Sequence, residues 1–275
     1  MDGQHESRAA EMLVGAARAV ISAGRQAVRS RVGREFAVRR KSKGNYVTDV
    51  DLAIETQLKR RLEEVAPEVG FVAEESAPQV ADGECWTIDP IDGTGNYLVG
   101  LPFTTAVAYM RDASHAIIGL VYDPQQDVLW WARESGGAYR LRCASECDIS
   151  GYDMLRGSSE RVALAEMTSG DGNVLFGMPY DRRKAHRILG YAERLFDGAG
   201  DLKRIGPASL DICRVAEGQA KLYIELDLKV WDYAAAELVL REAGGSALHR
   251  GDVSLFGSKG EIDAALEIIG GVCPG

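Results

Sequence analysis

The sequence lacks long apolar runs, although 46% of its 275 residues are hydrophobic. No run approaches the roughly 18 to 20 apolar residues that a membrane-spanning helix requires. Residues 1–6 are polar and do not form the apolar region of a secretion signal. We therefore expect a cytoplasmic protein that makes no membrane contact.

Cysteine and histidine are scarce as well. The cysteines are odd in number and scattered, which indicates reduced thiols and not a disulfide framework: Cys85, Cys143, Cys147, Cys213 and Cys273. Cys143 and Cys147 are spaced like a metal-binding pair, but no second Cys or His pair matches them, so ordinary thiols are favoured. The four histidines also lack ligand-like spacing, and we expect structural or surface roles for them.

Positively charged residues are fewer than negatively charged ones: 32 Lys and Arg residues against 41 Asp and Glu residues give a net charge of −9. This balance argues against a general nucleic-acid binder. Neither a Gly-x-Ser-x-Gly elbow nor a Walker-type loop is present. The composition is compatible with an enzyme whose metal ions supply local positive charge.

The first half of the chain predicts two helices and then an antiparallel meander. Helical spacing of apolar residues covers 6–31, and a second helix begins in the segment 45–51, with Thr48 as N-cap, and ends at Pro67. A short strand follows at 69–73. Successive strands with short connections are then expected at 103–111, 115–122, 127–131 and 138–142.

Beyond about residue 150, strands and helices alternate, which favours a second, more parallel layer. Strands are predicted at 174–177, 202–205 and 222–225, and helices at 181–196, 207–217, 231–243 and 261–269. No linker marks independent domains. We therefore expect one domain over 1–275, with subregions of about 1–150 and 151–275.

The stretch 84–98 carries the strongest chemical signal. A short apolar run, 85–88, leads into Asp89 and Asp92, and Gly93, Thr94 and Gly95 follow directly. Glycines let the backbone turn sharply and bring N–H groups close to a ligand. Two carboxylates beside such a turn are suited to holding divalent metal ions next to a phosphate.

Each of the other candidate acidic residues allows a structural and a functional interpretation. Asp51 lies in the first turn of its helix, where capping explains a carboxylate without any catalysis. Asp232 opens the helix 231–243, where it either stabilises that helix or reaches a metal. Glu74 follows the strand 69–73 and either is solvated or faces the same pocket as Asp89.

Eight basic residues lie between positions 25 and 43. Either they form a solvated face, or one of them near Lys41 attracts an anionic substrate.

Three separated motifs together resemble the inositol monophosphatase family: Asp89-Pro90-Ile91-Asp92-Gly93-Thr94, the upstream Glu74-Glu75-Ser76, and the downstream Trp231-Asp232-Tyr233-Ala234-Ala235. These are lithium-sensitive, magnesium-dependent sugar-phosphate phosphatases related to fructose-1,6-bisphosphatases. The resemblance implies an α/β fold, an alternating α/β/α/β/α sandwich with an N-terminal antiparallel sheet and a C-terminal mixed or parallel sheet.

The resemblance also implies a metal site for two or three Mg²⁺ ions, with Mn²⁺ as a substitute. Glu74, Asp89 and the Ile91 carbonyl oxygen correspond to ligands of a first ion. Asp89, Asp92 and Asp232 correspond to ligands of a second. A third, weaker ion near Glu74 is found in relatives.

Catalytic and substrate roles are implied in the same way. Asp51 and Thr94 correspond to the pair that activates the attacking water, with Glu74 as a further catalytic residue. The substrate-binding positions are Asp92, Gly93, Thr94, Ala208 and Glu225, with Gly206 beside them. Lys41 corresponds to a lysine on a mobile loop, and Lys43 is a competing alignment.

We therefore expect a magnesium-dependent phosphomonoesterase acting on a small polyol or sugar phosphate, foremost inositol monophosphate. The alternatives are a fructose-1,6-bisphosphatase, alone or as a second activity, a 3′-phosphoadenosine nucleotide phosphatase and a histidinol phosphatase. A non-catalytic regulatory or binding protein on the same scaffold is the alternative from another class. Relatives are often dimers, and a homodimer is expected.

Overall fold

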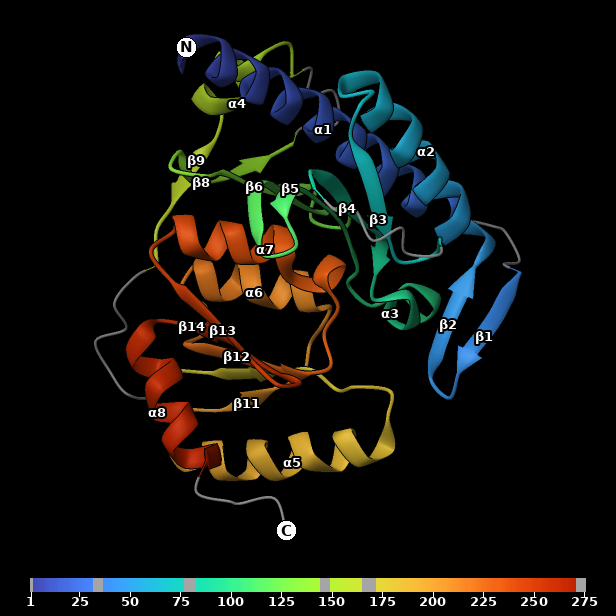
Figure 1. The fold of residues 1–275 in the computed structure, drawn as a ribbon. Coiled ribbons are helices and arrows are strands. Elements are labelled where there is room, and N and C mark those ends of the chain that lie inside the picture. Colours follow the sequence, from blue (N-terminus) through green and yellow to red (C-terminus); the bar gives the residue numbers. More distant parts are fainter. Residues whose placement is uncertain (1, 32–36, 77–82, 144–148, 165–171, 271–275) are drawn as a thin grey trace.

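The computed structural model describes residues 2–31, 37–76, 83–143, 149–164 and 172–270. Five layers alternate between helices and sheets, as Figure 1 shows. From one end to the other they are the helices α1 (Asp2–Arg31) and α2 (Asp49–Val65), a seven-stranded sheet, the helices α6 (Ala208–Ala216) and α7 (Val230–Glu242), a five-stranded sheet, and the helices α5 (Arg182–Phe196) and α8 (Lys259–Gly270). This confirms the predicted sandwich.

The seven-stranded sheet has its strands in chain order: β3 (Gly70–Ala73), β4 (Cys85–Asp92), β5 (Thr104–Asp112), β6 (His115–Asp123), β7 (Val128–Arg133), β8 (Gly137–Arg142) and β9 (Glu160–Val162). Pairing is antiparallel from β4 to β9, and the predicted meander corresponds to β5–β8 within this run. Only the edge strand β3 pairs in parallel, with β4. The carboxyl ends of β3 and β4 therefore lie at the same edge of the sheet.

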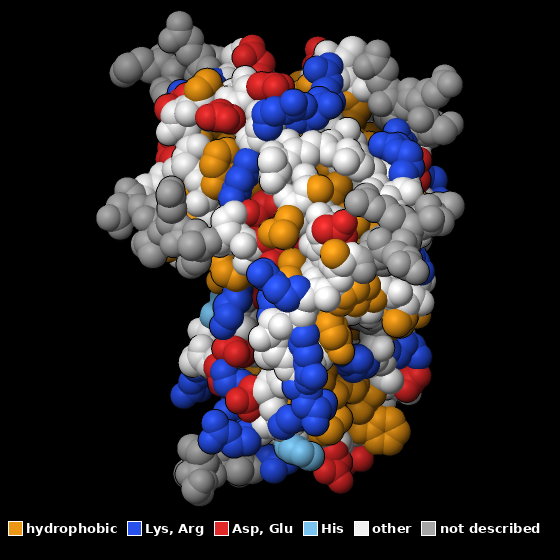
Figure 2. All heavy atoms as spheres, turned by 90° about the vertical axis from the view of Figure 1, so that its right-hand side faces the viewer, with side chains coloured by type: hydrophobic (Ala, Val, Ile, Leu, Met, Phe, Trp, Pro, Cys, Tyr) orange, Lys and Arg blue, Asp and Glu red, His pale blue; other side chains and the backbone are white. Residues whose placement is uncertain are grey.

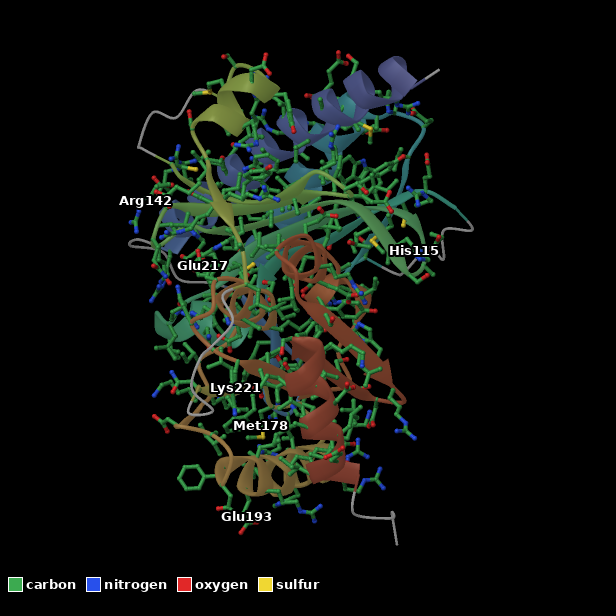
Figure 3. All side chains as sticks on the ribbon, turned by 90° about the vertical axis from the view of Figure 1, so that its left-hand side faces the viewer. His115, Arg142, Met178, Glu193, Glu217 and Lys221 are labelled. Carbon is green, nitrogen blue, oxygen red and sulfur yellow. The ribbon has the colours of Figure 1, made fainter. Side chains whose placement is uncertain are left out.

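Different helices cover the two faces of this sheet. The apolar stripe of α1, including Leu13, Ala16 and Val20, packs with α2 on one face. On the other face α7 lies so close that a Cβ at Gly119 of β6 would collide with the Ala235 carbonyl oxygen. Glu217, after the end of α6, accepts a hydrogen bond from Trp130 Nε1 of β7 at 2.9 Å and is labelled in Figure 3.

The five-stranded sheet has the order β11 (Leu202–Lys203), β10 (Val174–Phe176), β12 (Leu222–Leu226), β14 (Val253–Gly257), β13 (Ser246–Arg250). The three strands predicted from the sequence, β10, β11 and β12, are parallel. The hairpin β13–β14 was not predicted, and it pairs antiparallel to β12. The sheet is therefore mixed, with its parallel half as expected.

Several short elements were also not predicted: β1 (Val38–Ser42), β2 (Asn45–Thr48), α3 (Thr94–Val99) and α4 (Tyr152–Gly157). Residues 45–48, expected at the start of a helix, form the second strand of a hairpin that extends from the body of the molecule in Figure 1. The helix begins at Asp49 because Thr48 is extended and caps it through its side chain.

Cys85, Cys143 and Cys213 are buried and form no disulfide among the described residues, whereas Cys147, the other half of the predicted pair, lies outside them. No helix in the described part of the chain combines the length and apolarity needed to cross a bilayer.

Replacing Gly119 with Ala should destabilise the protein by about 1–3 kcal/mol, because the new methyl group would overpack the contact between β6 and α7. The matched control is Gly190→Ala in α5, where an added Cβ meets no atom within 4 Å. That change should stabilise the helix by about 0.5–1 kcal/mol. Urea unfolding of both variants measures the difference, and equal midpoints would contradict the close approach of α7.

Candidate active site

A cavity of about 650 Å³ opens where the hairpin β1–β2, the end of β4 and the five-stranded sheet meet. Its lining comes from six separate parts of the chain: the hairpin, the segment after β3, the β4–α3 turn, the β10–α5 connection, the segment before α6, and the β12–α7 connection. Figure 2 shows this side of the molecule, with acidic side chains set among apolar and basic ones.

The lining includes nearly every site residue expected from the sequence: Lys41, Glu74, Asp89, Ile91, Asp92, Gly93, Thr94, Gly206, Ala208, Glu225 and Asp232. Asp51 does not line it and lies fully buried behind Thr94. Lys43 is also absent from the described lining, so Lys41 is the hairpin lysine that reaches the cavity.

An irregularity in β4 determines where its two aspartates lie. Asp89 pairs with Ala106 and Asp92 with Thr104, so three steps along β4 match two steps along β5. In a regular strand, residues three apart point to opposite faces. The extra residue restores both carboxylates to one side, and both are buried, with 1% and 8% exposure.

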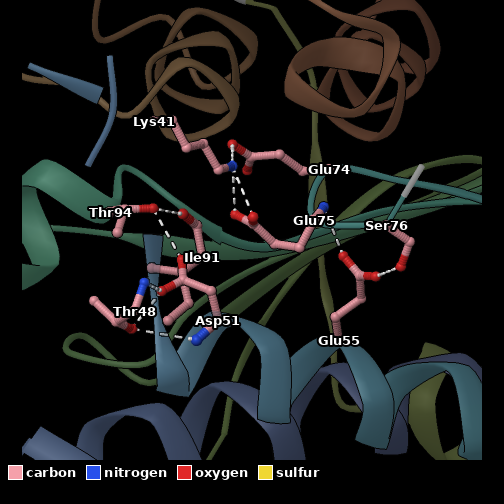
Figure 4. Close-up of polar contacts among 9 residues, drawn as sticks. All are labelled: Lys41, Thr48, Asp51, Glu55, Glu74, Glu75, Ser76, Ile91 and Thr94. Carbon is pink, nitrogen blue, oxygen red and sulfur yellow. Dashed lines mark hydrogen bonds and ion pairs between the residues drawn. The ribbon is translucent and has the colours of Figure 1, made fainter. Parts of the chain in front are cut away.

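The turn after β4 presents Thr94 to Asp51. Gly93 has φ = 90°, in the left-handed region that favours glycine, and α3 begins immediately after it. Thr94 Oγ1 donates to Asp51 Oδ1 at 2.9 Å, as Figure 4 shows. The other Asp51 oxygen accepts from the Thr48 amide at 2.8 Å, completing a capping box. Asp51 therefore caps its own helix and also holds a residue of the cavity.

Glu74 follows β3 and is held by strand and hairpin together. Its amide donates to the Ile88 carbonyl of β4 at 3.1 Å. Lys41 Nζ lies 3.1 Å from Glu74 Oε1 and 2.7 Å from the carboxylate of Glu75. The exposed strand β1 thus brings one ammonium group to two adjacent glutamates (Figure 4).

The C-terminal half supplies the opposite wall. Asp232, in the first turn of α7, accepts from the Lys229 amide at 2.6 Å. Glu225 on β12 accepts from the Tyr223 hydroxyl, and a Cβ at Gly177 would collide with its carboxylate, so glycine makes room for it. These contacts place two further carboxyl groups on the cavity wall.

Ser209 makes contacts in this site that were not predicted from the sequence. Its amide and hydroxyl, in the first turn of α6, donate to Asp92 Oδ2 at 2.8 and 2.6 Å, and its hydroxyl also bonds Thr104 Oγ1 at 2.6 Å. Asp92 is thereby fixed between the two sheets with one oxygen engaged by protein donors. A serine within a buried apolar helix carries no spacing signal that would have identified this role.

Burial and mutual repulsion favour the protonated form of these carboxyl groups. Burial raises the pKa of Asp89 and of Asp232 well above its ordinary value, and neighbouring carboxylates raise it further. Burial likewise raises the pKa of Asp92 and of Glu225 to about 7. A cation among them would favour the ionised forms and remove this cost.

The donor chemistry fits a hard divalent cation. All the side-chain donors are carboxylate oxygens, which Mg²⁺ and Mn²⁺ prefer. Asp89 Oδ1 is buried without a hydrogen-bond partner, as a coordinating oxygen would be before a metal binds. Within the described ranges, no three His, Cys, Asp or Glu side chains are already gathered in metal-binding geometry; Glu74 is engaged by Lys41 and Asp92 by Ser209.

The model of the inositol monophosphatase family matches residues 8–269, which include every carboxylate of this cavity. The chain belongs to the inositol monophosphatase family. A protein named Nus factor SuhB from Xylella fastidiosa is 33% identical over 209 residues, covering 74% of this chain and 69% of that relative. The protein of the same name from Escherichia coli K12 is 32% identical, covering 74% and 72%.

Solved structures of family members have the same fold. The extragenic suppressor protein suhB from Bartonella henselae aligns with a TM-score of 0.80 at 24% identity, covering 94% of this chain and 98% of that one. An IMPase from Thermotoga maritima aligns with a TM-score of 0.76 at 22% identity, covering 98% of both chains. Members of the family are metal-dependent, in keeping with the oxygen donors of the cavity.

Without metal, the free energy of unfolding should fall between about pH 4 and pH 7. The buried carboxyls of Asp92 and Glu225, with pKa values of about 7, bind protons in the folded state that the unfolded chain has already released. Each such proton contributes a slope of about −1.4 kcal/mol per pH unit in this window. Exposed carboxyls with lowered pKa values, such as Asp112 at about 2, titrate below it.

Urea unfolding in EDTA measures this slope, and the same series with Mg²⁺ provides the comparison. Metal favours the ionised carboxylates, so the decline should become shallower in its presence. A flat profile in EDTA would contradict the raised pKa values of Asp92 and Glu225.

Proposed function

We propose that the protein is a magnesium-dependent phosphomonoesterase that hydrolyses a small polyol or sugar phosphate, foremost inositol monophosphate. The observation that carries this proposal is the convergence of Glu74, Asp89, Asp92 and Asp232 on one cavity beside the Thr94–Asp51 pair. Four carboxyls that protein donors compensate only in part are costly to hold at one cavity, and divalent ions at a phosphate site would remove that cost.

Glu74, Asp89 and the Ile91 carbonyl would hold one ion, and Asp89, Asp92 and Asp232 a second. When bound, the ions lower the pKa of water and neutralise charge on the phosphoryl oxygens. The substrate phosphate is positioned at the turn by the Gly93 and Thr94 amides, which lie at the start of α3.

Thr94 and Asp51 orient the attacking water and accept its proton. Because Thr94 Oγ1 donates its own hydrogen to Asp51, its lone pairs face outward as acceptors for the water. The oxygen of that water bonds to phosphorus while the bond from phosphorus to the alcohol oxygen breaks, and the departing alkoxide takes up a proton from solvent to become the alcohol. The leaving alcohol lies toward Ala208 and Glu225, where a carboxylate accepts hydrogen bonds from hydroxyl groups.

Substituting Asp92 with Asn should lower kcat/KM by more than about 100-fold, because a direct metal ligand matters more than its outer partners, whose loss costs 10–100-fold. The fold should remain, as circular dichroism and urea unfolding would show. Asp197→Asn, at the exposed C-cap of α5, is the matched control and should retain activity. Undiminished turnover by the Asp92 variant would refute the assignment.

The substrate is tested with a panel of phosphate esters: inositol 1-phosphate, fructose 1,6-bisphosphate, 3′-phosphoadenosine 5′-phosphate and histidinol phosphate. Glu225 on the wall favours a hydroxyl-rich leaving group over a nucleotide, so inositol 1-phosphate should have the highest kcat/KM. Lithium should inhibit the reaction. A preference for the bisphosphate would favour the fructose-1,6-bisphosphatase alternative.

The name Nus factor in the relatives raises a non-catalytic or additional role on this scaffold. The complete carboxylate set and the intact Thr94–Asp51 pair favour catalysis. Absence of both Mg²⁺ binding and turnover across the panel would favour the binding or regulatory alternative. The expected homodimer and cytoplasmic location stay predictions.

A further inference from the structure

Helix α2 presents three charged side chains toward the candidate active site at successive turns: Asp51, Glu55 and Lys59. Residues four apart lie on the same face of a helix. Asp51 engages Thr94 at the end of β4. Glu55 and Lys59 engage the segment that follows β3, as Figure 4 shows for Glu55.

Both carboxylate oxygens of Glu55 are occupied. Oε2 accepts the Glu75 amide at 2.9 Å, and Oε1 accepts from the Ser76 hydroxyl and from Lys59 Nζ, the latter at 2.9 Å. Lys59 Nζ also donates to Ser76 Oγ at 2.5 Å. With only 4% exposure, Glu55 is a buried charge whose partners are one lysine of its own helix and two residues of the facing segment.

These contacts fix the residue next to Glu74 from the side opposite the cavity. The Glu74 amide is bonded to Ile88 of β4, and the Glu75 amide is bonded to Glu55 of α2. The backbone at Glu74 is therefore held between a strand and a helix while its side chain lines the cavity. Glu55 itself is not among the described lining residues.

We propose that Glu55 is a positioning residue for Glu74: it anchors the 74–76 segment to α2 and so directs the Glu74 carboxylate at the metal site. The proposal rests on the proposed function, in which Glu74 binds metal. Because α2 also anchors Thr94 through Asp51, one rigid helix sets the spacing between the water-activating pair and a metal ligand.

The test is Mg²⁺ binding by the full-length protein without substrate, measured by isothermal titration calorimetry. Glu55→Gln keeps the volume but removes the charge that Lys59 and Ser76 share. It should weaken Mg²⁺ binding by about 10–100-fold, the usual effect of losing an outer-shell partner. Glu63→Gln, an exposed residue of the same helix, is the matched control and should bind Mg²⁺ like the parent.

A second variant and a second readout separate positioning from stability. Ser76→Ala removes one contact with Glu55 and leaves the Glu75 amide in place, so a smaller loss of Mg²⁺ affinity is expected. For both variants, saturating Mg²⁺ should return kcat toward the parent value, which a damaged fold would not allow. Parent-like Mg²⁺ affinity in Glu55→Gln would overturn the proposal; should that variant fail to fold, parent-like affinity in Ser76→Ala would do so.

Asp89→Asn distinguishes failure of the positioning role of Glu55 from failure of the proposed metal site. If it abolishes Mg²⁺ binding while Glu55→Gln has no effect, the positioning role is refuted and the proposed metal site stands. If Asp89→Asn leaves Mg²⁺ binding intact, both are refuted.

Discussion

The repulsion between buried carboxylates is the constraint on which this structure depends. Asp89 and Asp92 are almost inaccessible to solvent, and Glu74 and Asp232 approach them from other segments of the chain. Protein donors compensate only part of this charge: Ser209 for Asp92, Lys41 for Glu74 and the Lys229 amide for Asp232. Asp89 has no such donor on Oδ1. The cluster is stable either with bound protons or with bound cations.

The compensating donors also connect the layers of the fold. Ser209 belongs to α6, between the two sheets, and it bonds an aspartate at the end of β4. Lys41 belongs to the projecting hairpin and donates to Glu74. The outer helix α2 contributes two acceptors behind the cavity, Asp51 for the Thr94 hydroxyl and Glu55 for the Glu75 amide. The geometry of the site consequently depends on how these layers pack together.

Much of this was predictable from local patterns. The β5–β8 meander, helices α1, α2, α5 and α7, and the parallel strands β10 and β12 follow from apolar periodicity and turn residues. The strands β13 and β2 were missed because their partly exposed residues carry no strong alternation, and β14 because its residues are nearly all buried and do not alternate. Asp89, Asp92 and the glycine turn are conspicuous at a strand end, whereas site roles for Asp51 and Asp232, in the first turns of helices, were implied by the resemblance to the family.

What the sequence could not predict are contacts between segments distant along the chain. Ser209 and Glu55 look like ordinary helical residues, and only the folded chain brings them to Asp92 and to the Glu75 amide. Asp51 was ambiguous for a related reason: capping and contact with Thr94 use different oxygens of the same carboxylate. A local pattern can establish the first role but not the second.

The irregularity in β4 has a consequence for how this region can vary. The extra residue places Pro90 and Ile91 together opposite Thr105, and the ladder between β4 and β5 is interrupted there. Removing one residue would give a regular strand in which the two acids, now two positions apart, still share one face. It would also remove the interruption, where the Ile91 carbonyl oxygen accepts from Thr94 Oγ1 at 3.3 Å. The length of this short segment therefore controls the position of a backbone oxygen and not the face on which the carboxylates lie.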